Sequence, residues 1–279
     1  MNIKKAVITA AGKNQNRLPL QVLVDSDGNQ KPAIRIIFNE VLSAGIDQVC
    51  LILSPNDREE YETALEGCPA KIQFLQQDEP LGYGHALLCA RDFVGPDAFL
   101  HLVSDHLYLS DKSESCAQQL VAAAQREACS VSAVQPTREG MLPYYGAIGG
   151  KGVPGQEKLY QIEKVLEKPT PTIAEQELIV PGLRAGHYLC FFGMHVLTAK
   201  IMEILASQQR GASASLPLSP ALSELAVREK YLACELAGRR YNLGVKFGLF
   251  NAQFALLLAG SEREEVLAQL LEVLATRAH

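Results

Sequence analysis

The feature that most constrains the fold is an alternation of short apolar runs and one-sided helical stripes along the first half of the chain. Apolar runs of strand length occupy residues 5–10, 49–53, 72–75, 99–103 and 130–134. Helical stripes occupy residues 31–44, a segment beginning at Ser54-Pro55, and residues 85–93 and 113–127. Alternation at this spacing is typical of right-handed parallel crossovers with helices on both faces of a sheet. It predicts an α/β fold with a doubly wound, mostly parallel sheet.

Polar residues and glycine follow several of these apolar runs directly. Gly12 comes after the first run, Gln77 after the third and Asp105 after the fourth. Ligands of a doubly wound sheet bind at the carboxyl ends of its strands. We therefore expect these three residues to be neighbours at one edge of the sheet.

The pattern becomes less regular after about residue 136. Shorter strand-like runs at residues 146–149, 159–165 and 187–192 lie between turns rich in glycine and proline, and helical stripes follow at 196–206, 219–229 and 246–259. A last helix is expected over residues 262–276. Its apolar stripe indicates packing against the core, with a subunit interface as the alternative. No repeat and no separating linker is found, which favours a single domain.

Composition and charge exclude several classes of protein. The 26 Lys and Arg residues against 31 Asp and Glu give a net charge of −5, which opposes sequence-independent binding to nucleic acid. Seven cysteines occur singly, without a Cys-x-x-Cys pair, so we expect them to be reduced and buried. The start of the chain lacks a signal-peptide core, and no apolar run approaches the ~20 residues of a membrane span. These features predict a cytoplasmic protein without a membrane or nucleic-acid partner.

Three groups of motifs carry the chemistry. The first is residues 5–12 (KAVITAAG), followed by Arg17; the second is Gln77 with residues 82–90 (GYGHALLCA). The third is the late set EKP at 167–169, AGHY at 185–188 and YNLGVK at 241–246. In this order and spacing they resemble sugar-1-phosphate nucleotidyltransferases, and most closely the bacterial UTP–glucose-1-phosphate uridylyltransferases, over nearly the whole chain.

The resemblance implies a Rossmann-like nucleotidyltransferase fold with an irregular sugar-binding lobe. Residues 1–135 would be the nucleotide-binding half, 136–260 the sugar-binding half and 261–279 a C-terminal helix. It further implies an enzyme that forms a UDP-sugar and pyrophosphate from UTP and a hexose-1-phosphate, most simply glucose-1-phosphate, for carbohydrate biosynthesis. Its partners would be these small substrates, with a homo-oligomer as a possible assembly.

The resemblance also implies the nucleotide contacts. Nucleotide binding would fall to Ala10, Ala11, Gly12, Gln77, Gly82 and Gly84. A glycine turn after the first strand lets backbone N–H groups approach phosphates, and the Gln77 amide would read the uracil edge. Taken alone, Gly12 is an ordinary turn glycine and Gln77 an ordinary loop residue.

The resemblance also implies which residues contact the sugar, the phosphates and the metal. The sugar would be held by Tyr145, Gly146, Glu167, Gly186 and Tyr188. The phosphates would be neutralised by Arg17, Lys168 and Lys246, as catalytic residues. Mg²⁺ would be bound by Asp105 and Asn242, since carboxylate and carbonyl oxygens suit that ion. Considered without the resemblance, Asp105 also suits an ordinary turn, and Lys246 also suits a solvated surface position.

The chain departs from the family pattern at three places. Residues 12–17 (GKNQNR) lack the second glycine and the threonine of the family's first loop, and the arginine is displaced by one position. The lysine of a later Pro-Lys pair is missing, with Lys13 and Lys31 as substitutes. Asn242 replaces the second metal-binding aspartate, which removes one charge. These changes leave open a second hypothesis: a catalytically impaired relative that binds a nucleotide or sugar nucleotide in a regulatory role.

Overall fold

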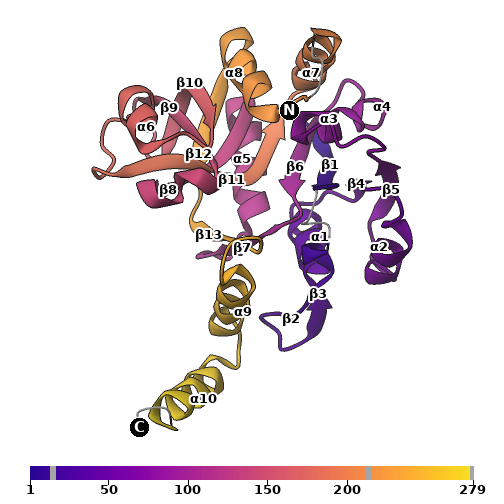
Figure 1. Cartoon of the computed structure of the whole chain (residues 1–279), viewed down its shortest axis with the longest axis vertical. Helices are drawn as coiled ribbons and strands as arrows, with labels where there is room; N and C mark the ends of the chain where they lie inside the picture. Colours follow the sequence, from indigo (N-terminus) through magenta and orange to yellow (C-terminus); the bar gives the residue numbers. More distant parts are fainter. Residues whose placement is uncertain (13–16, 212–214, 277–279) are drawn as a thin grey trace.

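The fold is built on one central sheet. The computed structural model describes residues 1–12, 17–211 and 215–276, and Figure 1 shows helices around this sheet and two final helices extending away from it. Nine strands form the sheet in the order β5-β4-β1-β6-β11-β8-β12-β10-β9. Their bounds are β1 Ile3–Ala10, β4 Gln48–Leu53, β5 Lys71–Gln76, β6 Ala98–Val103, β8 Ser130–Arg138, β9 Gly146–Gly152, β10 Leu159–Glu167, β11 His187–Leu197 and β12 Tyr231–Glu235.

The first four strands of that order form a parallel half. β1 pairs in parallel with β4 on one side and β6 on the other, and β4 pairs in parallel with β5. Ala6 lies between Val49 and Leu100 in this register. Near-continuous apolar runs suit these strands because both faces of a parallel sheet are covered. The strands predicted from the sequence here are confirmed.

The other half of the sheet is mixed, so the expectation of a mostly parallel sheet needs correction. β11 runs antiparallel to β6 and to β8, and β10 runs antiparallel to β9 and β12. β12 and β8 form a parallel pair. Only residues 153–158 connect β9 to β10, and a connection this short joins antiparallel strands because a parallel crossover needs a dozen residues or more.

Helices pack on both faces of the sheet, around two separate apolar cores. Ala6 and Ile8 of β1 enter one core, and Val7 enters the other. The first core is covered by α1 (Ala33–Ser43), α2 (Arg58–Ala64), α5 (Cys116–Glu127) and α9 (Gly248–Ala259). The second is covered by α3 (Tyr83–Leu88), α7 (Lys200–Gly211) and α8 (Leu218–Arg228).

Three expected helices differ from the structure. The helix expected to begin at Ser54-Pro55 begins only at Arg58, as α2. The helix expected over residues 85–93 is divided into α3 and the short α4 (Arg91–Val94). The helix expected over 196–206 begins only at Lys200, because Val196 and Leu197 continue β11. These two residues pair with Leu100 and Phe99 of the neighbouring strand β6. This strand pairing outweighs the local helical pattern.

The last helix, α10 (Arg263–Thr276), projects from the body of the molecule (Figure 1). Leu271 is 65% exposed and Leu274 59%, and no residue of α10 is buried. The expectation that its apolar stripe packs against the core is therefore wrong. The helix contacts α9 and begins shortly after Gly260, which ends α9.

Several short elements complete the fold. Two small antiparallel pairs join β7 (His106–Ser110) to β13 (Gly238–Asn242) and β2 (Val22–Val24) to β3 (Gln30–Pro32). Short helices are η1 (Leu18–Leu20), η2 (Glu139–Tyr144) and α6 (Pro171–Glu177). Within the described ranges, no helix combines the length and apolarity that a membrane crossing requires. All seven cysteines are free, as expected, and Cys50, Cys116, Cys129 and Cys190 are buried.

Candidate active site

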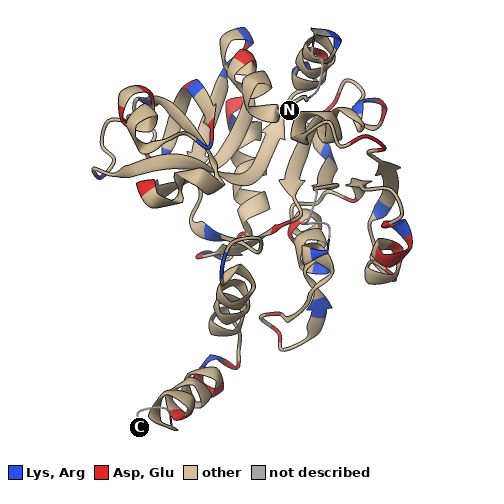
Figure 2. Cartoon of the chain, viewed as in Figure 1, with Lys and Arg blue, Asp and Glu red and all other residues tan. Residues whose placement is uncertain are grey.

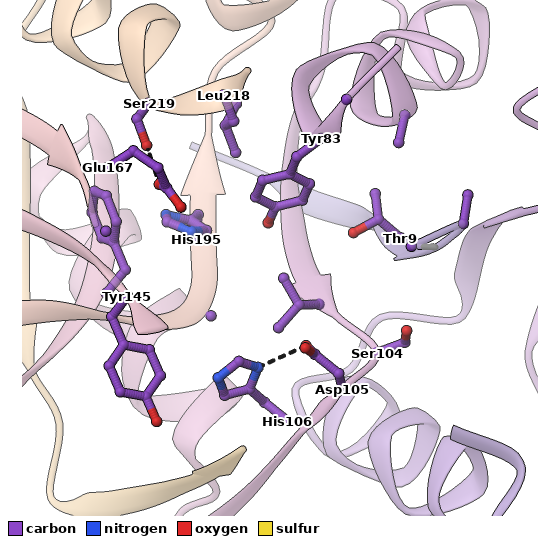
Figure 3. Close-up of a pocket in the computed structure, with 18 of the residues that line it drawn as sticks. Thr9, Tyr83, Ser104, Asp105, His106, Tyr145, Glu167, His195, Leu218 and Ser219 are labelled. Atoms are coloured by element: carbon purple, nitrogen blue, oxygen red, sulfur yellow. Dashed lines mark hydrogen bonds and ion pairs between the residues drawn. The ribbon is translucent and has the colours of Figure 1, made fainter. Parts of the chain in front are cut away.

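A pocket of about 460 Å³ opens where the parallel half of the sheet meets the mixed half. Its lining includes Ala10, Ala11 and Gly12 after β1, and Asp105 after β6. Tyr145, Gly146, Glu167 and Lys168 contribute from the mixed half. Figure 3 shows Thr9, Tyr83 and Asp105 on one side of the pocket and Tyr145, Glu167 and His195 on the other. Segments distant in sequence thus share one cavity, and Gly12, Gln77 and Asp105 are neighbours as expected.

Asp105 is the carboxylate at the end of β6. Its Oδ1 accepts a hydrogen bond from Nδ1–H of His106 at 2.8 Å, and its side chain is 19% exposed (Figure 3). Burial opposes its ionisation, but the electrostatic interaction and hydrogen bond with His106, together with Lys168, outweigh burial and lower the pKa of Asp105. Asp105 is therefore an anion at neutral pH, suited to a cation.

Glu167 ends β10 and Lys168 follows it, and both residues line the pocket. Ser219 Oγ donates to Glu167 Oε2 at 2.6 Å, which fixes the carboxylate. That oxygen lies 3.0 Å from the place where a Cβ on Gly146 would be, so glycine leaves it room. Lys168 has a φ of 44°, in the left-handed region that side chains other than glycine rarely adopt. Lys168 lines the cavity that Asp105 also lines, and its charge helps to lower the pKa of Asp105.

Gln77 is 5% exposed at the end of β5. Its Nε2 donates to the Gly82 carbonyl at 3.0 Å and lies 2.9 Å from His85 Nδ1. A carbonyl only accepts, so this contact identifies the amide nitrogen, and the amide oxygen is the group left for a ligand. Gly82 lines the pocket, whereas Gly84 lies behind it and packs against the backbone of Leu216.

A buried histidine network supports the pocket wall. His101 Nδ1 lies 2.9 Å from the Val7 carbonyl, and its Nε2 lies 2.6 Å from the Tyr83 hydroxyl. Burial lowers the pKa of His101 to about 4, so the ring is neutral. Since the Val7 carbonyl must accept, Nδ1 carries the proton and Nε2 accepts from Tyr83. His195 stacks on His101 with ring centroids 5.9 Å apart and contacts Ser132.

The sequence analysis missed several residues of this wall: Thr9, Tyr83, His101, His106, His195 and Ser219. One signal was available for the histidines. His101 interrupts the apolar run of β6, and His195 interrupts that of β11. A polar residue inside a strand covered on both faces needs a buried partner, and so marks a place where polar groups meet.

Six of the residues predicted for the site are absent from the pocket lining: Arg17, Gly84, Gly186, Tyr188, Asn242 and Lys246. Arg17 is exposed and paired with Glu60, and exposed Lys246 lies 5.0 Å from the ring of Phe247. Tyr188 belongs to a separate apolar cluster, and Gly186 precedes β11 with a φ of 71°. Lys31 pairs with Asp25, and Lys13 lies outside the described residues.

Asn242 nevertheless lies close to Asp105 along the backbone. It pairs with His106 between β13 and β7, and the next residue, Leu243, donates its N–H to the Asp105 carbonyl at 2.8 Å. The Asn242 side-chain oxygen accepts from the Gly244 N–H at 2.8 Å. This carbonyl oxygen is thus oriented by the turn that follows β13.

The donor set fits a cation that needs few protein ligands. The residues that the structure describes contain no group of three or more His, Cys, Asp or Glu arranged to hold a metal. Asp105 offers one carboxylate, with one oxygen already engaged by His106. A hard divalent cation such as Mg²⁺ retains waters and takes one or two carboxylates plus substrate phosphates, so a single aspartate suffices for it.

Comparisons with known proteins agree with the fold. The sequence model of the family described as Nucleotidyl transferase matches residues 17–241. The UTP–glucose-1-phosphate uridylyltransferase YngB of Bacillus subtilis (strain 168) is 30% identical over 304 aligned positions, which cover 98% of this chain and 96% of that protein.

Solved structures share the fold. A UDP-glucose pyrophosphorylase from Acinetobacter baumannii superposes with a TM-score of 0.77 at 23% identity, covering 98% of this chain and 100% of the other. A UDP-glucose pyrophosphorylase complexed with UDP-glucose has a TM-score of 0.76 at 24% identity and covers 91% of this chain and 98% of the other. The α/β nucleotidyltransferase fold expected from the sequence is confirmed.

Proposed function

Because this chain belongs to the nucleotidyl transferase family, we propose that it transfers the uridylyl group of UTP to glucose-1-phosphate, forming UDP-glucose and pyrophosphate. This proposal rests on one observation, which is that a single pocket is lined by Gly12, Gln77, Asp105, Glu167 and Lys168. Its near-full-length relative YngB bears the name of this activity. Free cysteines are compatible with a cytoplasmic location.

The parallel half supplies the proposed nucleotide contacts, so residues 1–135 act as the nucleotide-binding half. Ala10, Ala11 and Gly12 would place backbone N–H groups toward the triphosphate. The Gln77 amide oxygen would accept the N3–H of uracil, since its nitrogen already donates to Gly82. Cytosine presents an unprotonated nitrogen at that position, and CTP is therefore expected to be a poor substrate. Gly84 supports this wall from behind.

The mixed half, residues 136–260, supplies the proposed sugar contacts. Tyr145 and Gly146 line the pocket opposite Asp105, and the fixed carboxylate of Glu167 would accept hydrogen bonds from sugar hydroxyls. Gly186 and Tyr188 would act indirectly, through the apolar cluster to which Tyr188 and Tyr145 both belong. Residues 261–279 would form a separate C-terminal element of one domain.

The chemistry requires positioned reactants and positive charge. An oxygen of the sugar phosphate would attack the α-phosphorus of UTP in line, and pyrophosphate would leave. Lys168 would neutralise the sugar phosphate from the pocket wall. Arg17 would be the charge partner of the triphosphate and Lys246 would neutralise phosphate charge, both from positions outside the described lining. Asp105 and Asn242 would hold Mg²⁺, which supplies Lewis-acid stabilisation of phosphate charge when bound.

The test is release of pyrophosphate by the full chain with UTP, glucose-1-phosphate and Mg²⁺. We expect the native chain to turn over UTP. Turnover should be at least about 100-fold lower in Asp105→Asn, because this variant keeps the His106 hydrogen bond but removes the negative charge. The Tm of this variant should change little. Pyrophosphate release that is undetectable with every nucleotide and sugar phosphate, beside measurable binding of UDP-glucose, would instead favour the regulatory hypothesis. Normal turnover of Asp105→Asn would refute the metal role.

A further inference from the structure

A second cavity, of about 340 Å³, shares Tyr145 with the active-site pocket. Its polar lining comes from the end of β8, from β13, from the start of β11 and from the residue before β9: Gln135, Thr137, Arg138, Tyr145, His187 and Arg240. Pro136 and Met141 complete it, and none of these eight residues is acidic. We call this space the Arg240 cavity. In Figure 2 the β13 ribbon, which carries Arg240, is marked blue.

Arg240 is a buried cation with too few acceptors. The residue is 7% exposed, and its Nη2 donates to Thr137 Oγ1 at 3.1 Å. Its Nε and Nη1 are buried and lack a hydrogen-bond partner among the described residues. Burial lowers the pKa of Arg240, yet a guanidinium remains charged in proteins. A buried charge is normally paired, so these two N–H groups point to an acceptor that the chain does not supply.

The aromatic neighbour does not replace that acceptor. The Arg240 guanidinium carbon lies 3.9 Å from the centroid of the Tyr145 ring, so the cation rests on the ring face. This contact stabilises the positive charge. It leaves the N–H groups of Nε and Nη1 directed in the guanidinium plane, where each can donate to an acceptor oxygen.

The surroundings add positive charge at the mouth of the cavity. Arg138 is exposed at the end of β8 and forms no side-chain ion pair within the described part of the chain. His187 is half-buried, with Nδ1 3.3 Å from the Ala185 carbonyl. Glu139 is adjacent to Arg138 but lies on the Gly186 side, outside the lining. This concentration of basic groups contrasts with the net charge of −5 for the chain.

We propose that the Arg240 cavity binds an oxyanion, namely inorganic phosphate or the phosphate group of a small metabolite. Arg240 donates to it from Nε or Nη1, which lie on different edges of the guanidinium, and Arg138 provides positive charge at the mouth. The proposal does not depend on the uridylyl transfer assigned to the main pocket. Since Tyr145 lines both spaces, an occupied cavity would also fix the ring that faces the main pocket.

The experiment measures binding of inorganic phosphate to the full chain, by calorimetry and by the shift in Tm, with chloride added to equal ionic strength. Arg240→Met removes the donors while retaining volume, and Arg239→Met is its matched control on the exposed side of the same strand. Lys168→Ala removes the cation of the main pocket. We expect phosphate to bind and stabilise three proteins: the native chain, Arg239→Met and Lys168→Ala. In Arg240→Met the affinity for phosphate should fall at least about 10-fold.

Opposite results would overturn the proposal. Equal stabilisation of Arg240→Met by phosphate would remove Arg240 from the site, and a phosphate effect lost in Lys168→Ala but kept in Arg240→Met would place the ion in the main pocket. Absence of any phosphate binding to the native chain would also refute it. Should Arg240→Met fail to fold, Arg138→Gln decides, because weaker phosphate binding is expected there and unchanged binding contradicts the site.

Discussion

Lys168 occupies its place in the pocket at a conformational cost. Its φ of 44° lies in a region that disfavours side chains by about 1–2 kcal/mol relative to glycine. Its backbone N–H donates to the Tyr145 carbonyl at 3.2 Å, and this bond keeps the turn in place. Strain retained at a pocket is typical of positions chosen for chemistry, where the side chain matters more than the backbone.

Replacing this lysine should therefore separate activity from stability. In Lys168→Gly the relief of strain offsets the greater freedom of the unfolded chain, so the free energy of unfolding should stay within about 1 kcal/mol of the native value. Turnover should fall at least about 100-fold, because the cation near the phosphates is lost. Urea denaturation and pyrophosphate release measure the two effects. Retained turnover would show that Lys168 does not serve the reaction.

Asn242 offers a gain-of-charge test next to Asp105. In Asn242→Asp the new carboxylate can still accept from the Gly244 N–H, so the turn after β13 is preserved. A second anion near Asp105 should lower the Mg²⁺ concentration for half-maximal turnover by about 3- to 10-fold. Titrating Mg²⁺ in the pyrophosphate assay measures this. An unchanged midpoint would mean that residue 242 does not face the cation.

Part of the pocket can be predicted from sequence and part of it cannot. Gly12, Gln77 and Asp105 follow strands directly, and the parallel topology alone brings them together. The engagement of Gln77 with His85 and of Glu167 with Ser219 depends on contacts across loops, for which local patterns carry no signal. The position of exposed Lys246 outside the lining could not be foreseen for the same reason.

At the level of elements, α3 is held in place by the segment that precedes α8. Leu216 donates its N–H to the Leu81 carbonyl at 2.6 Å, and its own carbonyl accepts from His85 N–H at 3.2 Å. A Cβ on Gly84 would lie 2.8 Å from that carbonyl oxygen and 2.9 Å from the Pro217 carbonyl oxygen. The two segments can approach this closely because residue 84 has no side chain.

Gly84→Ala should accordingly destabilise the protein. Two backbone atoms would have to shift, at a cost of about 1–3 kcal/mol. Gly140→Ala is a matched control, since a Cβ there meets nothing within 4 Å. Thermal unfolding of both variants measures the difference. Equal Tm values for the two would contradict the close packing of α3 against the segment at 216–217.

Some strands can be predicted from the sequence and others cannot, depending on the apolar pattern of each strand and on its partner. Strands of the parallel half were predicted well, because burial on both faces leaves nearly pure apolar runs such as VCLIL in β4. The direction of β11 was not, since alternation of hydrophobicity is the same for either direction. β7 and β13 were missed altogether because they are short, and each depends on a partner more than a hundred residues away in sequence.

For the whole molecule, the seam between the two halves of the sheet contains buried histidines. His101 of β6 pairs in register with His195 of β11, and their rings are stacked. Burial lowers the pKa of both, to about 4 for His101. In the unfolded chain these histidines would titrate near the ordinary value of 6.5.

Folding stability should therefore decrease in acid. Above pH 6.5 the histidines are neutral in both states; below it the unfolded state binds protons that the folded state excludes until pH falls to about 4. His101 alone should contribute about 2 kcal/mol of loss between pH 6.5 and pH 5. Urea denaturation at these pH values measures it. His101→Gln should show a shallower dependence, and an identical slope in native chain and variant would exclude the histidine as its source.

The order of strands has a consequence for any attempt to divide this chain. The partner that covers the inner edge of β6 is β11, and it arrives only with residues 187–197. A truncated product ending near residue 135 would leave that edge with bare N–H and C=O groups. Such an edge is a template for self-association. During synthesis on the ribosome, the first half therefore remains prone to aggregation until residue 197 has emerged.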